Sequence, residues 1–335
     1  MKQKTFFLTK ISTWFILMVE LSIPLHLSAE EKNVEALANF QNQVGIYKYK
    51  LGDYKITSLS DGSVPQDLHA LLKGIDPANI DRLLATAHLN NPVEASINSF
   101  LIDTGNKLIL VDTGAGSFFG PGFGGKLLQR LNDAGYQADQ ITDILITHVH
   151  TDHTGGLVKD GLPLFPKAIL HIGKADLDFF LDPKNKDGVG GYDKAYFQQA
   201  NTALEPYVKL GHINPISGSK VLFTGVRAEP TPGHTPGHYF YRVESKGKAI
   251  TFIGDSVHVE SVQLPKPEIT IVYDVDAPSA AKQRAMQFAK IARDGHLIAA
   301  PHLPYPGIGY LNKDNTGSGY SFIRAEYHDR EGLQF

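Results

Sequence analysis

Four side chains of metal-binding type lie within six consecutive positions of this chain, His148, His150, Asp152 and His153. Neutral imidazole and carboxylate are ligands that zinc and similar divalent cations accept. On an extended backbone His148 and His150 point the same way, because side chains alternate with a period of two. Asp152 and His153 follow in the next turn, so they are offset towards a second ion. The spacing predicts a metal site rather than a histidine-rich surface loop.

Three further candidate ligands recur downstream, each directly after a segment that has the composition of a strand. His234 lies in a Thr-Pro-Gly-His repeat, Asp255 follows the predicted strand 249–253, and His302 follows the predicted strand 297–300. A hydrolase site with two metal ions needs such groups delivered from several strand ends onto one face. The pattern therefore predicts a dinuclear site that draws on both halves of the chain.

The elements that must position these residues alternate between strands and helices. We expect strands at 46–51, 54–59, 95–103, 107–112, 141–146, 168–172, 220–224, 239–244, 249–253 and 297–300, and helices at 125–134, 174–181, 194–204 and 278–293. Segment 66–89 is ambiguous, and Ser60-Asp61-Gly62 is expected to form a turn, with a role for Asp61 near the site as the alternative. This order favours an α/β fold in which two sheets pack face to face with helices outside.

The N-terminal segment 1–29 has the order of a secretory signal peptide. Three lysines precede an apolar stretch, and Ala29 offers a small residue before the acidic Glu30-Glu31. Glu20 and Pro24 interrupt the apolar run well short of the ~20 residues that a membrane span requires. We therefore expect export to the periplasm or the medium, removal of 1–29, and a single hydrolase domain over 30–335.

Composition excludes several classes of protein and site. The chain carries 32 basic and 35 acidic residues, a net charge of −3, so it has no general attraction for nucleic acid or anionic lipid. It contains no cysteine, which rules out disulfides and thiolate-bound metal. Any metal site must therefore use imidazole and carboxylate.

These motifs give the chain a clear resemblance to a known family. The H-x-H-x-D-H motif at 148–153 and Asp112 in Val-Asp-Thr-Gly resemble hydrolases of the metallo-β-lactamase superfamily. Within that superfamily the chain most resembles the methyl parathion hydrolase group. That likeness runs from about Gly45 to the C-terminus and rests on Leu51-Gly52-Asp53, Ser60-Asp61-Gly62, Phe119-Gly120-Pro121, Pro206-Tyr207-Val208-Lys209 and the segment His302 to Gly309.

The resemblance implies a fold and a role for each motif residue. It implies an αβ/βα sandwich of two mixed sheets, with His148, His150 and His234 binding one ion and Asp152, His153 and His302 the other. Asp255 would bridge the two ions, and a hydroxide held between them would attack the substrate. Asp112 would orient a ligand histidine. Two zinc ions are expected, although manganese, iron and cobalt accept the same ligands.

The substrate is indicated by softer features. Methyl parathion hydrolases have aromatic residues at positions that match Phe119, Phe180 and Phe197, although core packing is the alternative for each. His258 stands where related lactonases have a tyrosine, so we treat it as a catalytic and substrate-binding candidate. We expect a neutral, apolar lactone, aryl ester or organophosphate triester. The alternatives are a dedicated N-acyl-homoserine lactonase and an inactive metal-binding protein; the resemblance also favours a homodimer.

Overall fold

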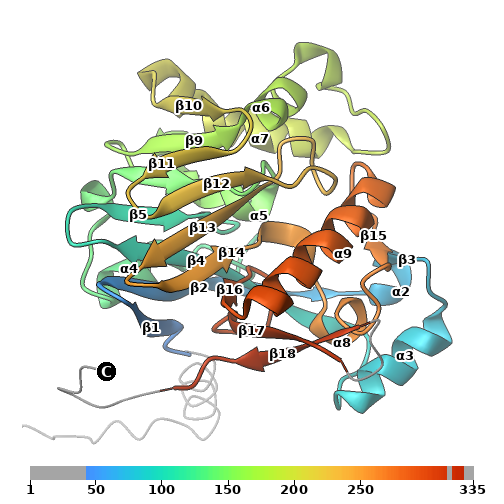
Figure 1. The fold of residues 1–335 in the computed structure, drawn as a ribbon. Helices are drawn as coiled ribbons and strands as arrows, with labels where there is room; N and C mark the ends of the chain where they lie inside the picture. The colour runs from blue at the N-terminus through green and yellow to red at the C-terminus, as the bar shows by residue number, and fades with distance from the viewer. Residues whose placement is uncertain (1–42, 315–318, 328–335) are drawn as a thin grey trace, which may run out of the picture. The chain divides into compact units, whose positions relative to one another are not determined.

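Two seven-stranded β-sheets form the framework of the protein in the computed structural model, which describes residues 43–314 and 319–327 (Figure 1). The described residues from Val44 onward form one compact unit. The expected signal segment 1–29 lies outside the described residues. Within them, no helix is both long enough and apolar enough to cross a membrane.

Both sheets are mixed. The first has the order β1 (Ile46–Leu51), β2 (Tyr54–Gln66), β4 (Val93–Asp103), β5 (Leu108–Val111), β6 (Asp143–Leu145), β9 (Ile169–Gly173) and β10 (Ile213–Ile216). The second has the order β11 (Lys220–Phe223), β12 (Val226–Pro230), β13 (Tyr239–Ser245), β14 (Lys248–Phe252), β16 (Leu297–Ala299), β17 (Ile308–Lys313) and β18 (Tyr320–Arg324). Two short pairs join β3 (Leu72–Lys73) to β15 (Thr270–Ile271) and β7 (Val158–Lys159) to β8 (Leu162–Pro163).

The helices connect these strands and cover the sheets. They are α2 (Leu68–Leu71), α3 (Pro77–Thr86), α4 (Leu127–Asp133), α5 (Thr151–Thr154), α6 (Lys174–Phe180), α7 (Lys194–Leu210), α8 (Glu260–Gln263) and α9 (Ala277–Asp294), with 3-10 turns η1 (Ala138–Gln140), η2 (Gly155–Leu157), η3 (Pro183–Asn185) and η4 (Gly254–Ser256). Aspartate side chains cap α3, α7 and α9 at their first turns. Glycines with positive φ, Gly211 and Gly295, end α7 and α9.

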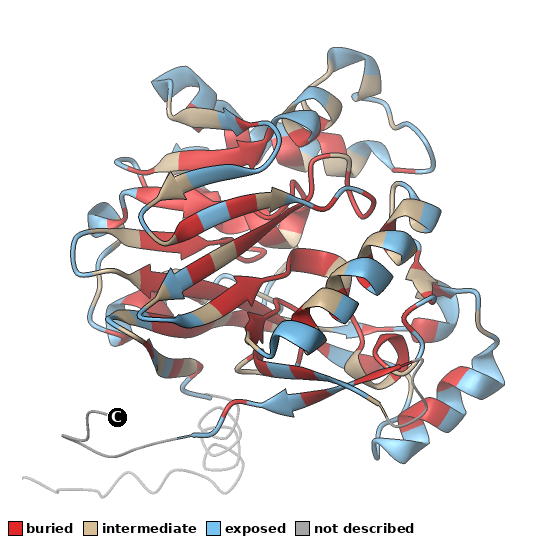
Figure 2. Cartoon of the chain, in the orientation of Figure 1, coloured by how far each residue is buried: buried red, intermediate tan, exposed pale blue. Residues whose placement is uncertain are grey.

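Three apolar layers give the sandwich its order. In β4, Phe100 and Ile102 face the second sheet, whereas Leu101 between them faces the helices of the first sheet. In β13, Tyr241 faces the first sheet, whereas Phe240 packs with Phe288 of α9. Figure 2 shows the strands largely buried and the outer side of α9 exposed. The predicted α/β sandwich of two mixed sheets with helices outside is confirmed.

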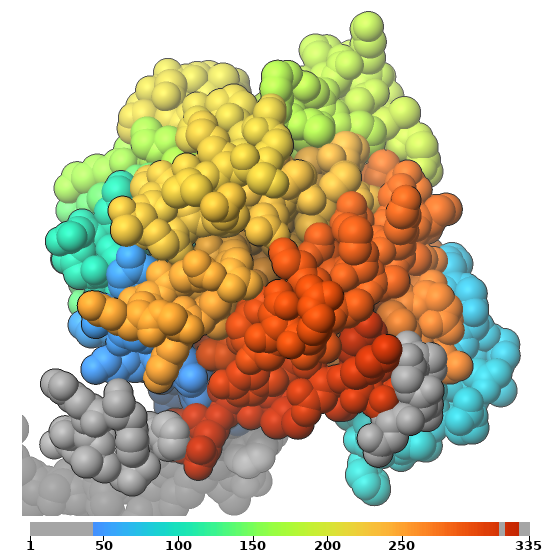
Figure 3. Space-filling view, viewed as in Figure 1, coloured from blue at the N-terminus to red at the C-terminus, as the bar shows by residue number. Residues whose placement is uncertain are grey.

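One face of the molecule is built from the C-terminal half of the chain. Figure 3 shows this face in yellow to red, with the orange-red side chains of α9 running across it. The spacing of apolar residues in α9 buries Phe288 and Ile291 against the second sheet and leaves Met286 exposed. Helix α9 therefore covers the outer face of the second sheet.

Several local predictions differ from the structure. Segment 60–62 continues β2 instead of turning, with a register shift between Ser60 and Gly62. Helix α7 runs past Pro206 to Leu210, because Tyr207 is fully buried and its hydroxyl donates to the carbonyl of Leu157 at 3.0 Å. Strands β10, β17 and β18 were not expected, because they are short or follow turns without strong alternation, whereas β12 is the strand-like segment expected before His234.

Candidate metal centre and active site

The predicted ligands lie where strands of both sheets end at one edge of the sandwich. Strands β12, β14 and β16 run in the same direction, because β13 is antiparallel to both β12 and β14 and β16 is parallel to β14. His234 follows β12, Asp255 lies in η4 after β14, and His302 follows β16. From the first sheet, the loop after β6 and helix α5 carry the remaining four side chains. The common direction explains how residues far apart in the sequence meet.

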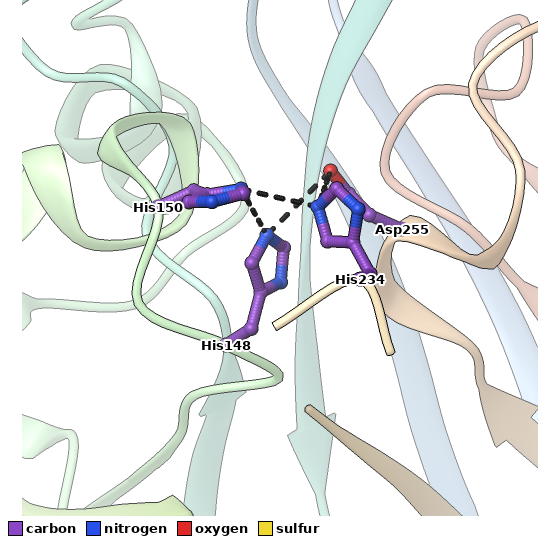
Figure 4. Close-up of side chains that lie close together, drawn as sticks. All are labelled: His148, His150, His234 and Asp255. Atoms are coloured by element: carbon purple, nitrogen blue, oxygen red, sulfur yellow. Dashed lines mark hydrogen bonds and ion pairs between the residues drawn. The ribbon is translucent and has the colours of Figure 1, made fainter. Parts of the chain in front are cut away.

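One cluster contains His148, His150, His234 and Asp255, whose ligand atoms lie within 4.8 Å of one another (Figure 4). His150 Nδ1 is 3.0 Å from His148 Nε2 and 3.1 Å from His234 Nε2. Asp255 Oδ2 is 3.6 Å from His148 Nε2 and 3.4 Å from His234 Nε2. Three ring nitrogens and one carboxylate oxygen thus converge on one point.

A second cluster of Asp152, His153 and His302 lies beside the first. Asp152 Oδ2 is 3.3 Å from His302 Nε2, and Asp152 Oδ1 is 3.8 Å from His153 Nε2. Asp255 also reaches this cluster, with Oδ1 at 3.1 Å from His153 Nε2 and Oδ2 at 3.2 Å from His302 Nε2. The carboxylate of Asp255 therefore lies between the two clusters.

The residues present fit a pair of divalent ions. His153 Nε2 and Asp255 Oδ1 are buried without a hydrogen-bond partner among the described residues, although buried polar atoms are almost always paired. The donor set of imidazole nitrogens and carboxylate oxygens matches the preferences of zinc and neighbouring metals. The two clusters are therefore consistent with a dinuclear metal site.

The second nitrogen of each histidine in the clusters has its own partner, which fixes the orientation of the ring. These contacts are His148 Nδ1 to Thr147 Oγ1 at 3.1 Å, His150 Nε2 to Tyr192 Oη at 3.1 Å, His153 Nδ1 to Asp112 Oδ2 at 2.9 Å, His234 Nδ1 to Asp274 Oδ1 at 2.8 Å and His302 Nδ1 to the carbonyl oxygen of Ser96 at 2.8 Å. Each ring thus turns its other nitrogen towards the cluster, where its neighbours are the other candidate ligands.

Asp112 combines an unusual backbone with a central set of contacts. Its φ is 57°, in the left-handed region that aspartate tolerates better than most residues. Besides His153, its carboxylate accepts from the backbone N–H and the hydroxyl of Thr147, both at 2.8 Å. Asp112 thereby ties the end of β5 to the start of the histidine motif, a position consistent with the orienting role that the family resemblance implies.

Sequence reasoning missed two buried carboxylates that support the site. Asp274 contacts His234 as described, and its other oxygen accepts from the backbone N–H of Ile271 at 3.1 Å. Asp176 accepts from the backbone N–H groups of Val149 at 2.9 Å and Gly237 at 2.6 Å. No motif spacing marks either residue, because their partners come from other elements.

Two buried histidines outside the seven predicted ligands lie beside Asp255. His238 Nε2 accepts from the backbone N–H of Asp255 at 3.1 Å, so this histidine supports the loop that carries the carboxylate. His258 Nε2 lies 3.1 Å from Asp255 Oδ2, and its ring stacks on that of His302 at 5.2 Å between centroids. His258 is therefore part of the site.

Burial and neighbouring charge set the protonation of the ligands. Burial, reinforced by the neighbouring imidazoles, holds the pKa of His148 and His150 well below the ordinary value. Burial also opposes charge on His234, but the carboxylates of Asp255 and Asp274 outweigh it and raise the pKa to about 9. Burial alone would raise the pKa of Asp255, but the surrounding imidazoles hold it well below the ordinary value. The position between the two clusters is thus occupied by a carboxylate in its charged form.

The two clusters open into a cavity of about 560 Å³. His150, Asp152, Asp255, His258 and His302 form its polar floor, and its walls include Val64, Leu71, Phe119, Phe123, Tyr196 and Tyr273. Among the described residues that line it, none is Lys or Arg.

Only one of the three predicted pocket phenylalanines reaches this cavity. Phe119 lines it, whereas Phe180 and Phe197 are fully buried in the core between the first sheet and its helices. Their placement differs from the prediction because helical geometry turns Tyr196 towards the cavity and its neighbour Phe197 inward. Phe180 still contacts the site from the core side, since its ring centroid lies 5.7 Å from that of His150.

Comparisons with known proteins agree with this geometry. Residues 93–302 match the family model of the metallo-β-lactamase superfamily. The crystal structure of the hydrolase AbOPH of the β-lactamase superfamily superposes with a TM-score of 0.80 at 36% identity, over 86% of this chain and 100% of that one. AidC, a dizinc quorum-quenching lactonase in complex with the product N-hexanoyl-L-homoserine, superposes with a TM-score of 0.77 at 26% identity, over 85% of this chain and 99% of that one.

A sequence relative gives a more partial match. A probable metallo-hydrolase of Mycobacterium tuberculosis is 26% identical over 180 residues, which cover 47% of this chain and 56% of that protein. The match thus spans little more than half of the relative's length. The family match covers more than half of the present chain and contains all seven predicted ligands. On this basis the chain belongs to the metallo-β-lactamase superfamily.

Proposed function

We propose that the protein is a dinuclear metal-dependent hydrolase of neutral, apolar ester-like substrates, of the methyl parathion hydrolase type. The observation that carries the proposal is the place of Asp255 at the floor of a largely apolar cavity. Its carboxylate belongs to one His/Asp cluster and lies 3.1 Å and 3.2 Å from two histidines of the other, His153 and His302. Lactones, aryl esters and organophosphate triesters all present a polarised centre with a good leaving group. One site can therefore serve several of them.

The seven predicted residues would hold the two ions, which we expect to be zinc. His148, His150 and His234 would serve one position, Asp152, His153 and His302 the other, and Asp255 both. When bound, such ions supply an activated water at neutral pH and polarise the group under attack. Asp112 and Asp274 keep His153 and His234 in the orientation that presents Nε2 to the clusters.

His258 is placed to assist the substrate directly. It lines the cavity, and its Nε2 lies 3.1 Å from Asp255 Oδ2. Burial lowers the pKa of His258, so its imidazole is neutral near pH 7. A neutral ring at this point can donate a hydrogen bond to a carbonyl, phosphoryl or leaving-group oxygen held beside Asp255. We expect His258→Ala to lower kcat more than it raises KM.

The walls of the cavity account for the choice of a neutral substrate. Phe119, Phe123, Tyr196 and Tyr273 offer aromatic surface, which suits an acyl chain or an aryl leaving group. A phosphomonoester or a nucleic acid carries negative charge that the described lining, with its acidic Asp67 and Asp152 and without Lys or Arg, would not neutralise.

A dedicated N-acyl-homoserine lactonase is the second candidate. Its support is the likeness to AidC, which carries a homoserine product and covers nearly the whole described chain. A lactone with an acyl tail would place its ring over Asp255 and its tail along the aromatic wall. This candidate predicts a strong preference for lactones that carry such a tail.

A substrate panel distinguishes these functions. The metal-replete mature protein is assayed with a long-chain homoserine lactone, a simple lactone, an aryl acetate, a phosphotriester and a β-lactam, with Asp255→Ala as the control. Turnover of several ester classes, all lost in the control, supports the broad hydrolase. Turnover of the homoserine lactone alone supports the lactonase. Two bound ions without turnover of any substrate would indicate an inactive metal-binding protein and overturn the proposal.

Export and dimer formation complete the proposal. The signal-like order of 1–29 supports export and cleavage, which the intact mass of the protein recovered from the periplasm tests directly. A mass that includes Met1 would argue against cleavage. The dimer rests on the family resemblance, and sedimentation of the mature protein would decide it.

A further inference from the structure

A β-bulge places one aspartate beside the cavity wall. In the pairing of β2 with β4, Ser60 lies opposite Asn98 and Gly62 opposite Ile97, so Asp61 has no partner of its own. A bulge of this kind redirects the side chain of the extra residue, and bulges recur next to active sites. The Asp61 side chain is fully buried.

The carboxylate of Asp61 binds both ends of the glycine-rich loop 114–125. Four backbone N–H groups donate to it: Ala115 at 2.9 Å, Gly116 at 3.3 Å and Gly125 at 3.0 Å to Oδ2, and Leu127 at 2.9 Å to Oδ1. The carbonyl oxygen of Asp61 also accepts from the N–H of Lys126 at 3.1 Å. One residue thus closes the base of the loop from both sides.

The loop is shaped to surround this carboxylate. A Cβ added at Gly114, whose φ is +74°, would lie 2.3 Å from Asp61 Cγ, and one at Gly124 would lie 2.8 Å from Asp61 Oδ2. Only glycine permits both approaches. Burial raises the pKa of Asp61, and the four N–H groups offset part of that rise. The backbone of the loop thus forms an anion-binding site, and the carboxylate of Asp61 occupies it.

The same loop connects the metal site to the cavity wall. At its start, the N–H of Thr113 donates to the carbonyl of His153 at 2.9 Å, and the N–H of Gly156 donates to the carbonyl of Gly114 at 3.1 Å. Further along, Phe119 and Phe123 line the cavity. The base of the loop is fixed by Asp61, whereas its tip forms part of the wall.

We propose that Asp61 is a positioning residue that determines which substrates the cavity accepts, by holding Phe119 and Phe123 at the wall. The substrate part of this inference rests on the proposed hydrolase function, whereas the anchoring of the loop does not. The inference gives the Ser-Asp-Gly motif a role that the metal centre leaves unexplained. Loss of the anchor releases the wall but leaves the metal clusters in place.

The test compares Asp61→Asn with Asp103→Asn. Asp103 also organises a turn, accepting from the N–H of Gly105 at 2.8 Å, but it lies at the opposite end of β4 and β5 from the site. Hydrogen exchange of loop 114–126, bound metal, and kcat and KM for a small aryl acetate and a bulky aryl ester are measured. For Asp61→Asn we expect exchange of the loop to be faster by about tenfold or more. We also expect unchanged metal content, a roughly tenfold higher KM for the bulky ester and little change for the small one.

A double variant separates positioning from general destabilisation. If Asp61 acts through the wall, the effects of Asp61→Asn and Phe119→Ala should not add, because the two residues are coupled. The KM of the double variant for the bulky ester should then be little higher than that of Asp61→Asn alone. Three outcomes would each overturn the inference. They are additive effects of the two substitutions on KM, an equal loss of activity towards both esters together with loss of metal, and wild-type hydrogen exchange of the loop. If the wild type hydrolyses neither ester, the proposed function fails, and the exchange measurement still decides the anchor.

A milder variant covers the case in which Asp61→Asn does not fold. Gly124→Ala introduces a methyl group 2.8 Å from Asp61 Oδ2 without a change of charge. We expect the same selective rise in KM for the bulky ester, at a smaller size of about threefold. Wild-type kinetics together with wild-type exchange of the loop in this variant would also contradict the inference.

Discussion

The metal centre and the cavity wall meet at the same floor, but the protein holds them in different ways. In the centre, each of the five histidines is buried and has a second hydrogen-bond partner that fixes its ring. In the wall, Phe119 and Phe123 lie on a loop, and Phe123 is 40% exposed. The rings of the centre are therefore fixed by buried contacts, whereas the tip of the wall loop is partly exposed.

This difference separates the type of reaction from the choice of substrate. The geometry of the clusters determines what chemistry the protein can perform. The wall determines which apolar groups reach them. Neighbouring residues of α7 also differ in role, since Tyr196 lines the cavity and Phe197 belongs to the core. We therefore expect substitutions in the two regions to produce different kinetic signatures.

The largest effect is expected at the carboxylate shared by both clusters. Asp255→Ala should lower kcat/KM about 10³-fold or more for every substrate, because it removes a donor from both positions of a two-metal site. Metal analysis should show fewer than two ions. Asp143→Asn is the control, since Asp143 is a buried carboxylate 2.9 Å from a histidine, His171, outside the site. Two tightly held ions in Asp255→Ala would reject the shared role.

A smaller loss is expected when an orienting carboxylate is changed. Asp112→Asn keeps the shape but removes the charge that faces His153 Nδ1 at 2.9 Å. Changes of this kind beside a ligand typically cost about 10- to 100-fold in metal affinity or activity. Titration with zinc in competition with a chelator measures the affinity. Wild-type affinity and activity would show that Asp112 only fixes the backbone of its loop.

The wall should respond selectively. Phe119→Ala should reduce kcat/KM for a bulky aryl ester by about 5- to 150-fold, because a lost apolar contact is worth about 1–3 kcal/mol. An aryl acetate that does not reach the wall should change much less, and metal content should stay at two. Equal losses for both esters would place Phe119 in the reaction centre or in the core.

The core residue next to the wall should show the smallest effect on activity and a clear effect on stability. Phe197→Ala should cost about 3–5 kcal/mol of the free energy of unfolding, because it leaves a cavity in the core. Phe180→Ala should behave alike. Well below the lowered melting temperature, kcat/KM should stay close to wild type for small and bulky esters. A selective fall in kcat/KM for the bulky ester without a fall in melting temperature would indicate that Phe197 lines the pocket.

The sequence predicted the polar residues of the site better than its aromatic ones, for a physical reason. Ligands of one ion must follow short, regular spacings or strand ends, so His148 to His153 and the later Asp255 stand out along the chain. An aromatic residue carries no such constraint, because the same side chain suits a wall or a core. Which residues of α7 point inward depends on what the helix packs against, so the inward position of Phe197 needs the tertiary structure.

Supporting residues escaped prediction because their partners come from distant elements. Asp176 lies in α6 but binds Val149 and Gly237, and Asp274 lies between β15 and α9 but binds His234. The Ser-Asp-Gly segment matched a turn by composition, yet the pairing of β2 with β4 continues through it as a bulge. The α/β class followed from the alternation of strands and helices, and the αβ/βα arrangement from the family resemblance, whereas such details need the tertiary structure.

The contribution of both halves of the chain to one centre also bears on how the sandwich stays closed. Four of the donors come from the first sheet side and three, His234, Asp255 and His302, from the second. Ions bound there would cross-link the two sheets at one edge, in a chain that has no cysteine to do so. Such a cross-link is indifferent to thiol reductants but opens with chelators and acid. We therefore expect the redox state of its surroundings to leave this protein's stability unchanged and the local supply of metal to govern it.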